Sequence, residues 1–358
     1  MKPTKGVCER AFPLRWWCRS SIVVVLLCFR ALVWLCLLPV VTTPETPVHS
    51  LEISAEERLL VLAPHPDDET LGAAGVLQGV LARGGQARVV VLTAGDGYIE
   101  AVQHATGLPV PPPTAYLAYG QRRLRELRAA MRRLGGHHIR VQVLGFPDGD
   151  LMSLLDAHWL RTQPERSPTT AVAHPPYPDV LTAAVAYDGA DLQRELQYVL
   201  HESQPTLIAF PDPLDRHPDH RAAGLFTLLA LQHWLPQTTA PPRLLAYLVH
   251  WPNWPPGWDA TPPLTQTLET GCSFPPDLPA RGLGRWGLPL TEADSATQRA
   301  ALTHYASQLA VMPAFLAAFV CRNEPFTEFT PAAVHRVLEG LHQRHQLPSH
   351  RPTAGGPQ

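Results

Sequence analysis

The chain has 358 residues, of which 45% are hydrophobic and 17% charged, so it can bury a core and is not a wholly disordered chain. Its formal net charge of −2 excludes a generally basic nucleic-acid-binding protein, and no nucleic acid is expected as a partner. The 39 prolines are about twice the usual share and follow no collagen period, which predicts long, stiff loops.

The first 50 residues have the pattern of a targeting segment followed by a spacer. Their six basic and two acidic residues give +4, which leaves −6 for the rest of the chain. The basic residues precede an apolar run, residues 22–41, which is about one bilayer span long and is interrupted by Arg30 and Pro39. No small-residue cleavage site follows, so a signal anchor is favoured over a cleaved signal peptide, and over a buried helix of the main domain. Either signal predicts export, with the body secreted or held by the membrane outside the cytoplasm.

The body, residues 51–342, alternates short apolar runs with amphipathic stretches. Buried strands are predicted at 58–63, 87–93, 141–146, 206–210 and 244–249. Helices are predicted at 69–83, 121–134, 190–201, 219–234 and 291–312, with a restart at Pro313. This alternation predicts a Rossmann-like α/β fold, in which helices flank a mostly parallel sheet. Long irregular segments are expected at 96–119, 147–189 and 251–289, and a disordered tail at 343–358.

Only two of the six cysteines, Cys272 and Cys321, lie in the body. They have no CxxC spacing, so a cysteine zinc site is not expected. An exported protein permits a disulfide between them, but the sequence leaves that pairing open.

The first group of chemically active side chains follows the first predicted strand, in the string APHPDDE. In open α/β sheets ligands bind at the carboxyl ends of the strands. His65 and Asp68 can both reach one metal there, and Asp67 can then take a proton from a metal-bound water. The alternative is that the acidic residues cap the following helix, which explains one or two of them.

A second group, HPDH, follows the fourth predicted strand and contains His217, Asp219 and His220. Two histidines and one carboxylate that converge from parallel strands form a three-ligand zinc site with an open position for water. The same ligands suit ferrous iron. We therefore expect a metal site at the C-terminal ends of the strands.

These paired motifs resemble those of the PIG-L/LmbE family of zinc-dependent N-acetylglucosaminyl deacetylases, in particular its exported bacterial members. The resemblance spans about residues 56–330 and includes LTAGDG, GFPDGDL, HYASQ and FVCRNEPF. It implies that His65, Asp68 and His220 bind zinc and that Asp67 is the general base. It also implies that His217 steadies the tetrahedral intermediate or protonates the leaving amine.

Two further roles come from the same resemblance. Asp219 matches a carboxylate that orients a neighbouring histidine. Arg123, in an RxxE pattern with Glu126, matches a substrate-binding arginine, and its alternative role is a solvated charge on a basic helix face. Asp215 stands where some members have an aromatic side chain, so no role is carried over to it.

The resemblance implies hydrolysis of the N-acetyl group of an N-acetylglucosamine-type sugar, with release of acetate. Export favours an extracytoplasmic glycan, glycolipid or glycoconjugate as the substrate. The alternatives are a cytoplasmic deacetylase of a small thiol-precursor glycoside and a surface carbohydrate-binding protein without catalysis. A dinucleotide-binding oxidoreductase is disfavoured because no GxGxxG follows the first strand. His250 ends a predicted strand and could face the site, although a structural role is expected for most other histidines.

Overall fold

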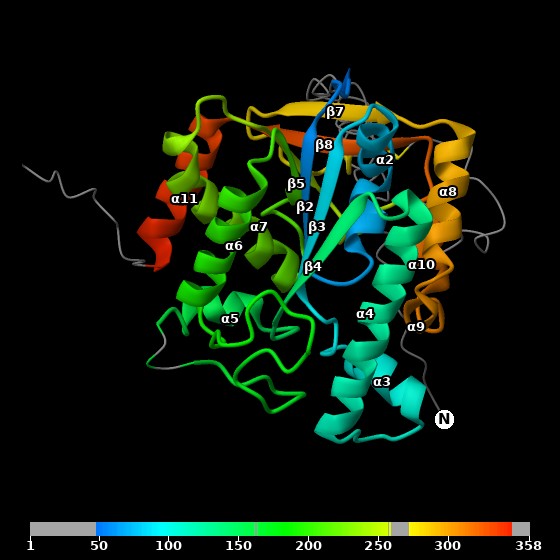
Figure 1. Ribbon diagram of the computed structural model, residues 1–358, viewed down its shortest axis with the longest axis vertical. Helices are drawn as coiled ribbons and strands as arrows, with labels where there is room; N and C mark the ends of the chain where they lie inside the picture. The colour runs from blue at the N-terminus through cyan, green and yellow to red at the C-terminus, as the bar shows by residue number, and fades with distance from the viewer. Residues whose placement is uncertain (1–47, 161, 163, 257, 259–271, 346–358) are drawn as a thin grey trace, which may run out of the picture. The chain divides into compact units, whose positions relative to one another are not determined.

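A computed structural model describes residues 48–345 apart from 161, 163, 257 and 259–271 (Figure 1). The predicted leader up to residue 47, including the apolar run 22–41, lies outside the described residues, as does the predicted tail from residue 346. Among the residues that are described, no helix is both long enough and apolar enough to cross a membrane.

The centre of the body is an eight-stranded sheet. Its strands, in spatial order, are β1 (Val48–Ser50), β7 (Gly284–Pro289), β8 (Asn323–Phe329), β6 (Arg243–Tyr247), β5 (Leu207–Pro211), β2 (Arg58–Ala63), β3 (Gln86–Thr93) and β4 (Ile139–Phe146). Five of the seven neighbouring pairs are parallel, and β8 runs antiparallel to β6 and β7. The predicted Rossmann-like, mostly parallel sheet is therefore confirmed, with one antiparallel strand inserted near an edge.

The strand order creates a switch point between β2 and β5. From β2 the chain continues outward to β3 and β4 on one side, and then returns to β5 and β6 on the other side. The connections after β2 and β5 therefore leave the sheet in opposite directions, which opens a crevice at the carboxyl ends of these strands. The two sequence motifs follow these two strands, so the fold brings them to the same crevice.

Helices cover both faces of the sheet (Figure 1). One face carries α2 (Asp68–Ala82), α4 (Pro113–Gly135), α8 (Glu292–Leu302), α9 (Ala306–Leu309) and α10 (Pro313–Ala318). The other carries α5 (Leu151–Asp156), α6 (Gly189–Ser203), α7 (Pro218–Trp234) and α11 (Pro331–His345), while α3 (Ile99–Thr106) lies beyond the strand ends beside α4. Alternate residues of β2 enter the two cores, with Leu59 and Val61 on one face and Leu60 and Leu62 on the other. Because such strands are buried on both faces, they are nearly continuous apolar runs in the sequence.

The structure differs from the predicted elements mainly in the irregular segments. Helix α4 begins at Pro113, eight residues before the predicted start, because proline fits the first turn of a helix. The predicted helix 291–312 is interrupted after Leu302, where Tyr305 leaves the helical path and turns its hydroxyl toward α2. The last helix ends at His345, so its final turn includes the first three residues of the predicted tail.

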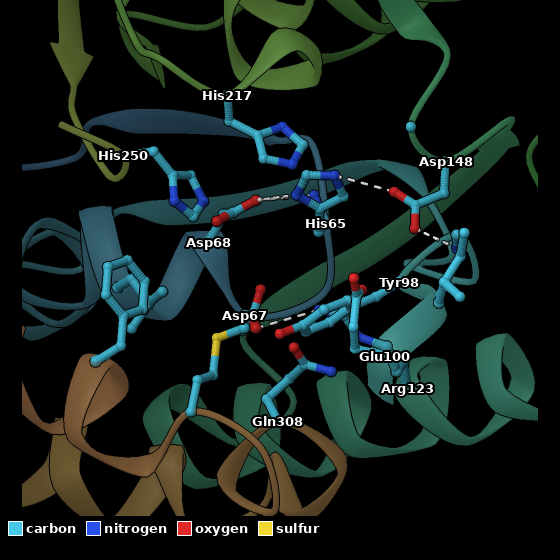
Figure 2. Close-up of a pocket in the computed structure, with 16 residues that line it drawn as sticks. His65, Asp67, Asp68, Tyr98, Glu100, Arg123, Asp148, His217, His250 and Gln308 are labelled. Atoms are coloured by element: carbon cyan, nitrogen blue, oxygen red, sulfur yellow. Dashed lines mark hydrogen bonds and ion pairs between the residues drawn. The ribbon is translucent and has the colours of Figure 1, made fainter. Parts of the chain in front are cut away.

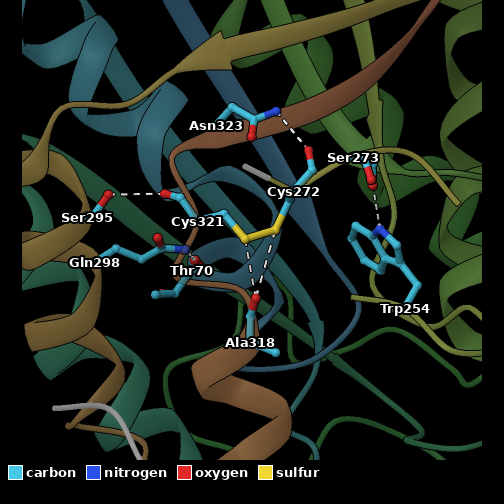
Figure 3. Close-up of a disulfide and its surroundings, with 9 residues drawn as sticks. All are labelled: Thr70, Trp254, Cys272, Ser273, Ser295, Gln298, Ala318, Cys321 and Asn323. Atoms are coloured by element: carbon cyan, nitrogen blue, oxygen red, sulfur yellow. Dashed lines mark hydrogen bonds between the residues drawn. A yellow bond between two sulfur atoms is a disulfide. The ribbon is translucent and has the colours of Figure 1, made fainter. Parts of the chain in front are cut away.

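Cys272 and Cys321 form a disulfide, with Cα atoms 5.6 Å apart (Figure 3). The bond joins the end of the 251–272 segment to the residues just before β8. The Asn323 side chain donates a hydrogen bond to the Cys272 carbonyl at 2.8 Å, and the Ser295 hydroxyl donates to the Cys321 carbonyl at 3.1 Å. The disulfide and the Asn323 bond attach Cys272 to the residues around the start of β8, and the Ser295 bond attaches Cys321 to α8.

Removing this disulfide is expected to destabilise the fold. In the chain-entropy model, a bond that closes a loop of 49 residues stabilises the folded state by about 4 kcal/mol. The double variant Cys272→Ser/Cys321→Ser should therefore have a clearly lower free energy of unfolding in urea titrations. Each single variant should lose a similar amount, because either one breaks the bond. Variants that unfold at the wild-type urea concentration would show that the bond does not stabilise the protein.

Candidate active site

A cavity of about 350 Å³ opens at the carboxyl ends of the parallel strands (Figure 2). His65, Asp67 and Asp68 reach it from the turn after β2, and His217 reaches it from the turn after β5. Its walls also include Arg123, Asp148, His250, Tyr98, Glu100, Gln308, Met312 and Phe315. The two motifs, separated by about 150 residues in the sequence, therefore line one cavity.

His65 and Asp68, which line this cavity, form a buried group with His220. One oxygen of Asp68, Oδ2, lies 3.1 Å from His65 Nδ1 and 3.2 Å from His220 Nε2. One nitrogen or oxygen from each of the three side chains lies within 4.8 Å of the others. Neither ring nitrogen of the fully buried His220 makes a hydrogen bond within the described part of the chain. A buried imidazole that approaches a carboxylate at 3.2 Å without a hydrogen bond, beside a second imidazole, fits a metal ion, and the nitrogen and oxygen ligands suit zinc or ferrous iron.

Two carboxylates flank the other ring nitrogen of His65. Its Nε2 lies 3.0 Å from Asp148 Oδ1 and 3.3 Å from Asp219 Oδ2. The Asp219 carboxylate also accepts hydrogen bonds from the backbone amides of Gly149 and Leu151, at 2.7 and 3.0 Å. Carboxylates in this position fix the tautomer and the ring orientation of a metal-binding histidine. The histidine that contacts the Asp219 carboxylate is therefore His65, while a ring nitrogen of His217 lies within 4.8 Å of the same carboxylate and of a His65 nitrogen, so these three side chains form a second, overlapping group of possible ligands.

Asp148 is a site residue that was not predicted from the sequence. It lies in GFPDGDL, two residues after β4. Its position just after a predicted strand is the sequence feature that could have identified it as a site residue. Its approach to His65 depends on the order of the strands, because β3 lies between β4 and β2.

Replacing Asp148 with Asn is expected to weaken metal binding by about 10-fold to 100-fold, because the amide cannot orient His65 as a carboxylate does. The metal dissociation constant would be measured by competition with a chelator. Asp179→Asn is the matched control, since this carboxylate is exposed and pairs with Arg128 at 3.2 Å. Equal affinities in the two variants would show that Asp148 does not support the metal ligand.

Asp67 stands at the N-cap position just before α2, but its side chain makes no capping hydrogen bond to the helix. Its carboxylate lines the cavity and accepts a hydrogen bond from Arg123 at 3.1 Å (Figure 2). Burial raises the pKa of Asp67 to about 7, against the lowering effect of the Arg123 guanidinium. A carboxyl group with a pKa near neutrality suits a general base. The capping alternative is therefore wrong for this side chain.

Arg123 is buried and is not a solvated charge on the helix surface. Its guanidinium donates to the carbonyls of Gly95 and Pro66, at 3.0 and 2.8 Å, in addition to Asp67. It therefore fixes the Asp67 turn relative to the turn after β3. It also lines the cavity, and the substrate-binding role implied for it stays a prediction.

His217 is held in one orientation by the start of α7. Its Nδ1 accepts a hydrogen bond from the Asp219 amide at 3.2 Å, which places the proton of the neutral ring on Nε2. Burial and the neighbouring His65 and His220 lower its pKa to about 4, so the ring is neutral at pH 7. In this form His217 can donate a hydrogen bond from Nε2 toward a reacting oxygen.

Asp215 and His250 extend the site on the side of β6. The buried Asp215 carboxylate lies 3.5 Å from His220 Nδ1 and accepts from the amides of Val249 and His250, at 2.9 and 3.0 Å. The His250 ring lines the cavity, with its centroid 4.7 Å from that of His220 and 5.0 Å from that of His217. His250 therefore faces the site, and Asp215, to which the resemblance carried no role, lies beside a candidate metal ligand.

The fold and the site define a Rossmann-like α/β protein with a candidate metal centre at the switch point of its sheet. Residues 60–231 match the family described as PIG-L: GlcNAc-PI de-N-acetylase, and the chain contains a domain of this family.

One curated relative is 1D-myo-inositol 2-acetamido-2-deoxy-alpha-D-glucopyranoside deacetylase 1 of Saccharopolyspora erythraea. It is 31% identical over 183 residues, which are 50% of this chain and 55% of the relative, so the chain spans about half of that relative's length. Similar solved structures include the conserved protein TT1542 from Thermus thermophilus (24% identity, TM-score 0.43, 77% of this chain and 96% of that one). Another is the A40926 pseudoaglycone deacetylase Dbv21 (22% identity, TM-score 0.47, 76% of this chain and 96% of that one).

Proposed function

We propose that the protein is a metal-dependent hydrolase that removes the N-acetyl group from an N-acetylglucosamine-type sugar and releases acetate. The observation that carries this proposal is the buried group of His65, Asp68 and His220 with the Asp67 carboxylate beside it in one cavity. The description of the matching family and the name of the curated relative, both of which denote removal of an acetyl group from such a sugar, support it.

His65, Asp68 and His220 would hold the metal, which we propose to be zinc, with ferrous iron as the alternative. When bound, such an ion acts as a Lewis acid toward the acetyl carbonyl and lowers the pKa of water. Asp67 accepts the proton of the attacking water, and Arg123 keeps its carboxylate in place. His217 donates a hydrogen bond from Nε2 to the oxyanion that develops on the acetyl group. As the amide C–N bond breaks, the protonated Asp67 returns a proton to the leaving nitrogen, which gives the amine and acetic acid; the acid's proton then passes to the amine, so the products at neutral pH are the ammonium form and acetate.

The test is an acetate-release screen of the purified full-length protein against N-acetylated chitooligosaccharides, N-acetylglucosaminides and glycolipids. Metal content is measured by mass spectrometry on the same sample. We expect one free amine for each acetate, and activity that is lost with a chelator and restored by zinc or ferrous iron. Sugar binding without acetate release would instead support a carbohydrate-binding protein without catalysis.

We further propose that the catalytic domain works outside the cytoplasm, secreted or held at the membrane by its N-terminal segment. The Cys272–Cys321 disulfide supports this location, because disulfides persist mainly in oxidising compartments. The basic cluster followed by an apolar run in the first 50 residues supports it as well. Alkaline phosphatase fused after residue 47 should be active in a bacterial host only if this segment directs export. An inactive fusion and a cytosolic protein would favour the small thiol-precursor glycoside as the substrate.

A further inference from the structure

The turn that presents Asp67 has a backbone conformation that needs support. Asp67 has φ 139° and ψ −29°, a region that side chains other than glycine rarely adopt. Such conformations persist only where surrounding contacts hold them. A conventional helix cap would turn this carboxylate back to the amides of α2, whereas here it points into the cavity.

Glu69 supplies one of these supporting contacts. Its side chain is fully buried and does not line the cavity. Glu69 Oε2 accepts a hydrogen bond from the Asp67 amide at 3.1 Å, so it binds the strained residue directly. Its other oxygen, Oε1, accepts from the Thr70 hydroxyl at 2.7 Å and from the Tyr305 hydroxyl.

Tyr305 links this turn to the segment between α8 and α9. It is fully buried, and its hydroxyl also lies 3.0 Å from Thr70 Oγ1. Gln298 of α8 donates a second bond to the same turn, from its side-chain amide to the Thr70 carbonyl at 2.9 Å (Figure 3). The residue that precedes α9, three residues after the end of α8, is thus the one whose hydroxyl fixes Glu69.

We infer that Glu69 and Tyr305 are positioning residues for the hydrolysis: they hold the Asp67 backbone in the conformation that directs its carboxylate into the cavity. This inference rests on the proposed function, because its kinetic effect passes through Asp67. A purely structural role for Tyr305 would lower the stability of the fold without changing turnover. The two roles are separated by measuring kcat, KM and stability together.

The test compares Tyr305→Phe and Glu69→Gln with the control Tyr187→Phe in the full-length enzyme. Tyr187 is as deeply buried, and its hydroxyl donates to the Gly145 carbonyl at 2.9 Å, so its removal costs a comparable hydrogen bond elsewhere. We expect both site variants to lower kcat about 100-fold, with KM and metal content unchanged. The double variant should be no slower than the slower single variant, because the two side chains act as one unit. Tyr187→Phe should lower the melting temperature but keep the wild-type kcat.

Crystal structures of the same variants complete the test. In Tyr305→Phe, or in Glu69→Gln if the former does not fold, Asp67 should return to negative φ with its carboxylate turned from the cavity. Wild-type turnover in Tyr305→Phe, a loss no larger than in Tyr187→Phe, or an unchanged Asp67 backbone would overturn the inference. If the wild-type protein releases no acetate from any substrate, the proposed function fails, and the crystal structures still decide whether Tyr305 holds Asp67.

Discussion

The variant Asp67→Asn is expected to lower kcat for acetate release by about 1000-fold and to keep the wild-type metal content. Asparagine has nearly the shape of aspartate and can keep a contact with Arg123, but it cannot accept a proton from water. Asp67 is not one of the three candidate ligands, His65, Asp68 and His220. Its replacement therefore leaves those ligands in place. The loss should therefore appear in kcat rather than in metal binding or in KM.

The measurements are steady-state kinetics of acetate release and metal analysis of the same preparation. Asp179→Asn serves as the control, because it makes the same change at an exposed carboxylate that does not line the cavity. This variant should keep the wild-type rate. Turnover by Asp67→Asn at the wild-type rate would show that another group takes the proton. Loss of the metal together with the activity would instead make Asp67 part of the metal site.

The central strands could be predicted from sequence because they are buried on both faces. β2 is predicted at its observed bounds, and β3 to β6 within a few residues, since each is an apolar run bounded by polar turns. β7 is different, because it contains two glycines and a proline and is half exposed, and it exists through its pairing with β8. Such a strand, which lies second from the edge of the sheet between β1 and β8, has little local signal, so its position becomes clear only from the sheet.

The candidate site shows the same division between local and long-range information. His65, Asp67 and Asp68 lie in one short string, and His217 and His220 in another, so residue type and spacing after a strand were enough to find them. Asp215 stands two residues before His217 in the second string, whereas Asp148 and His250 have no such partnered spacing. Their place in the site follows from the order β6-β5-β2-β3-β4, which brings the ends of non-adjacent strands together. The hydrogen bond from Tyr305 to Glu69 joins residues that are 236 positions apart in the sequence. No short stretch of sequence could have predicted this contact.

The variant His220→Ala tests the ligand set itself and is expected to abolish both metal binding and turnover. His220 is fully buried and contributes one of the three converging ligand atoms. Removing it should raise the metal dissociation constant by well over ~100-fold, beyond the 10-fold to 100-fold loss expected when only an orienting carboxylate is removed. Acetate release should fall at least as far as in Asp67→Asn, and zinc or ferrous iron at micromolar concentration should not restore it.

His250→Ala is the matched comparison, because it removes an imidazole whose ring centroid lies 4.7 Å from that of His220. The His250 ring lies close to His220, yet it does not belong to the group of three whose ligand atoms converge. We therefore expect His250→Ala to keep one metal ion per chain while His220→Ala keeps none, as measured by mass spectrometry after dialysis. If both variants lost the metal, the ion would sit closer to β6 and His250 would be a ligand. If neither lost it, the pair of His65 and Asp68 would have to bind the metal with a partner other than His220.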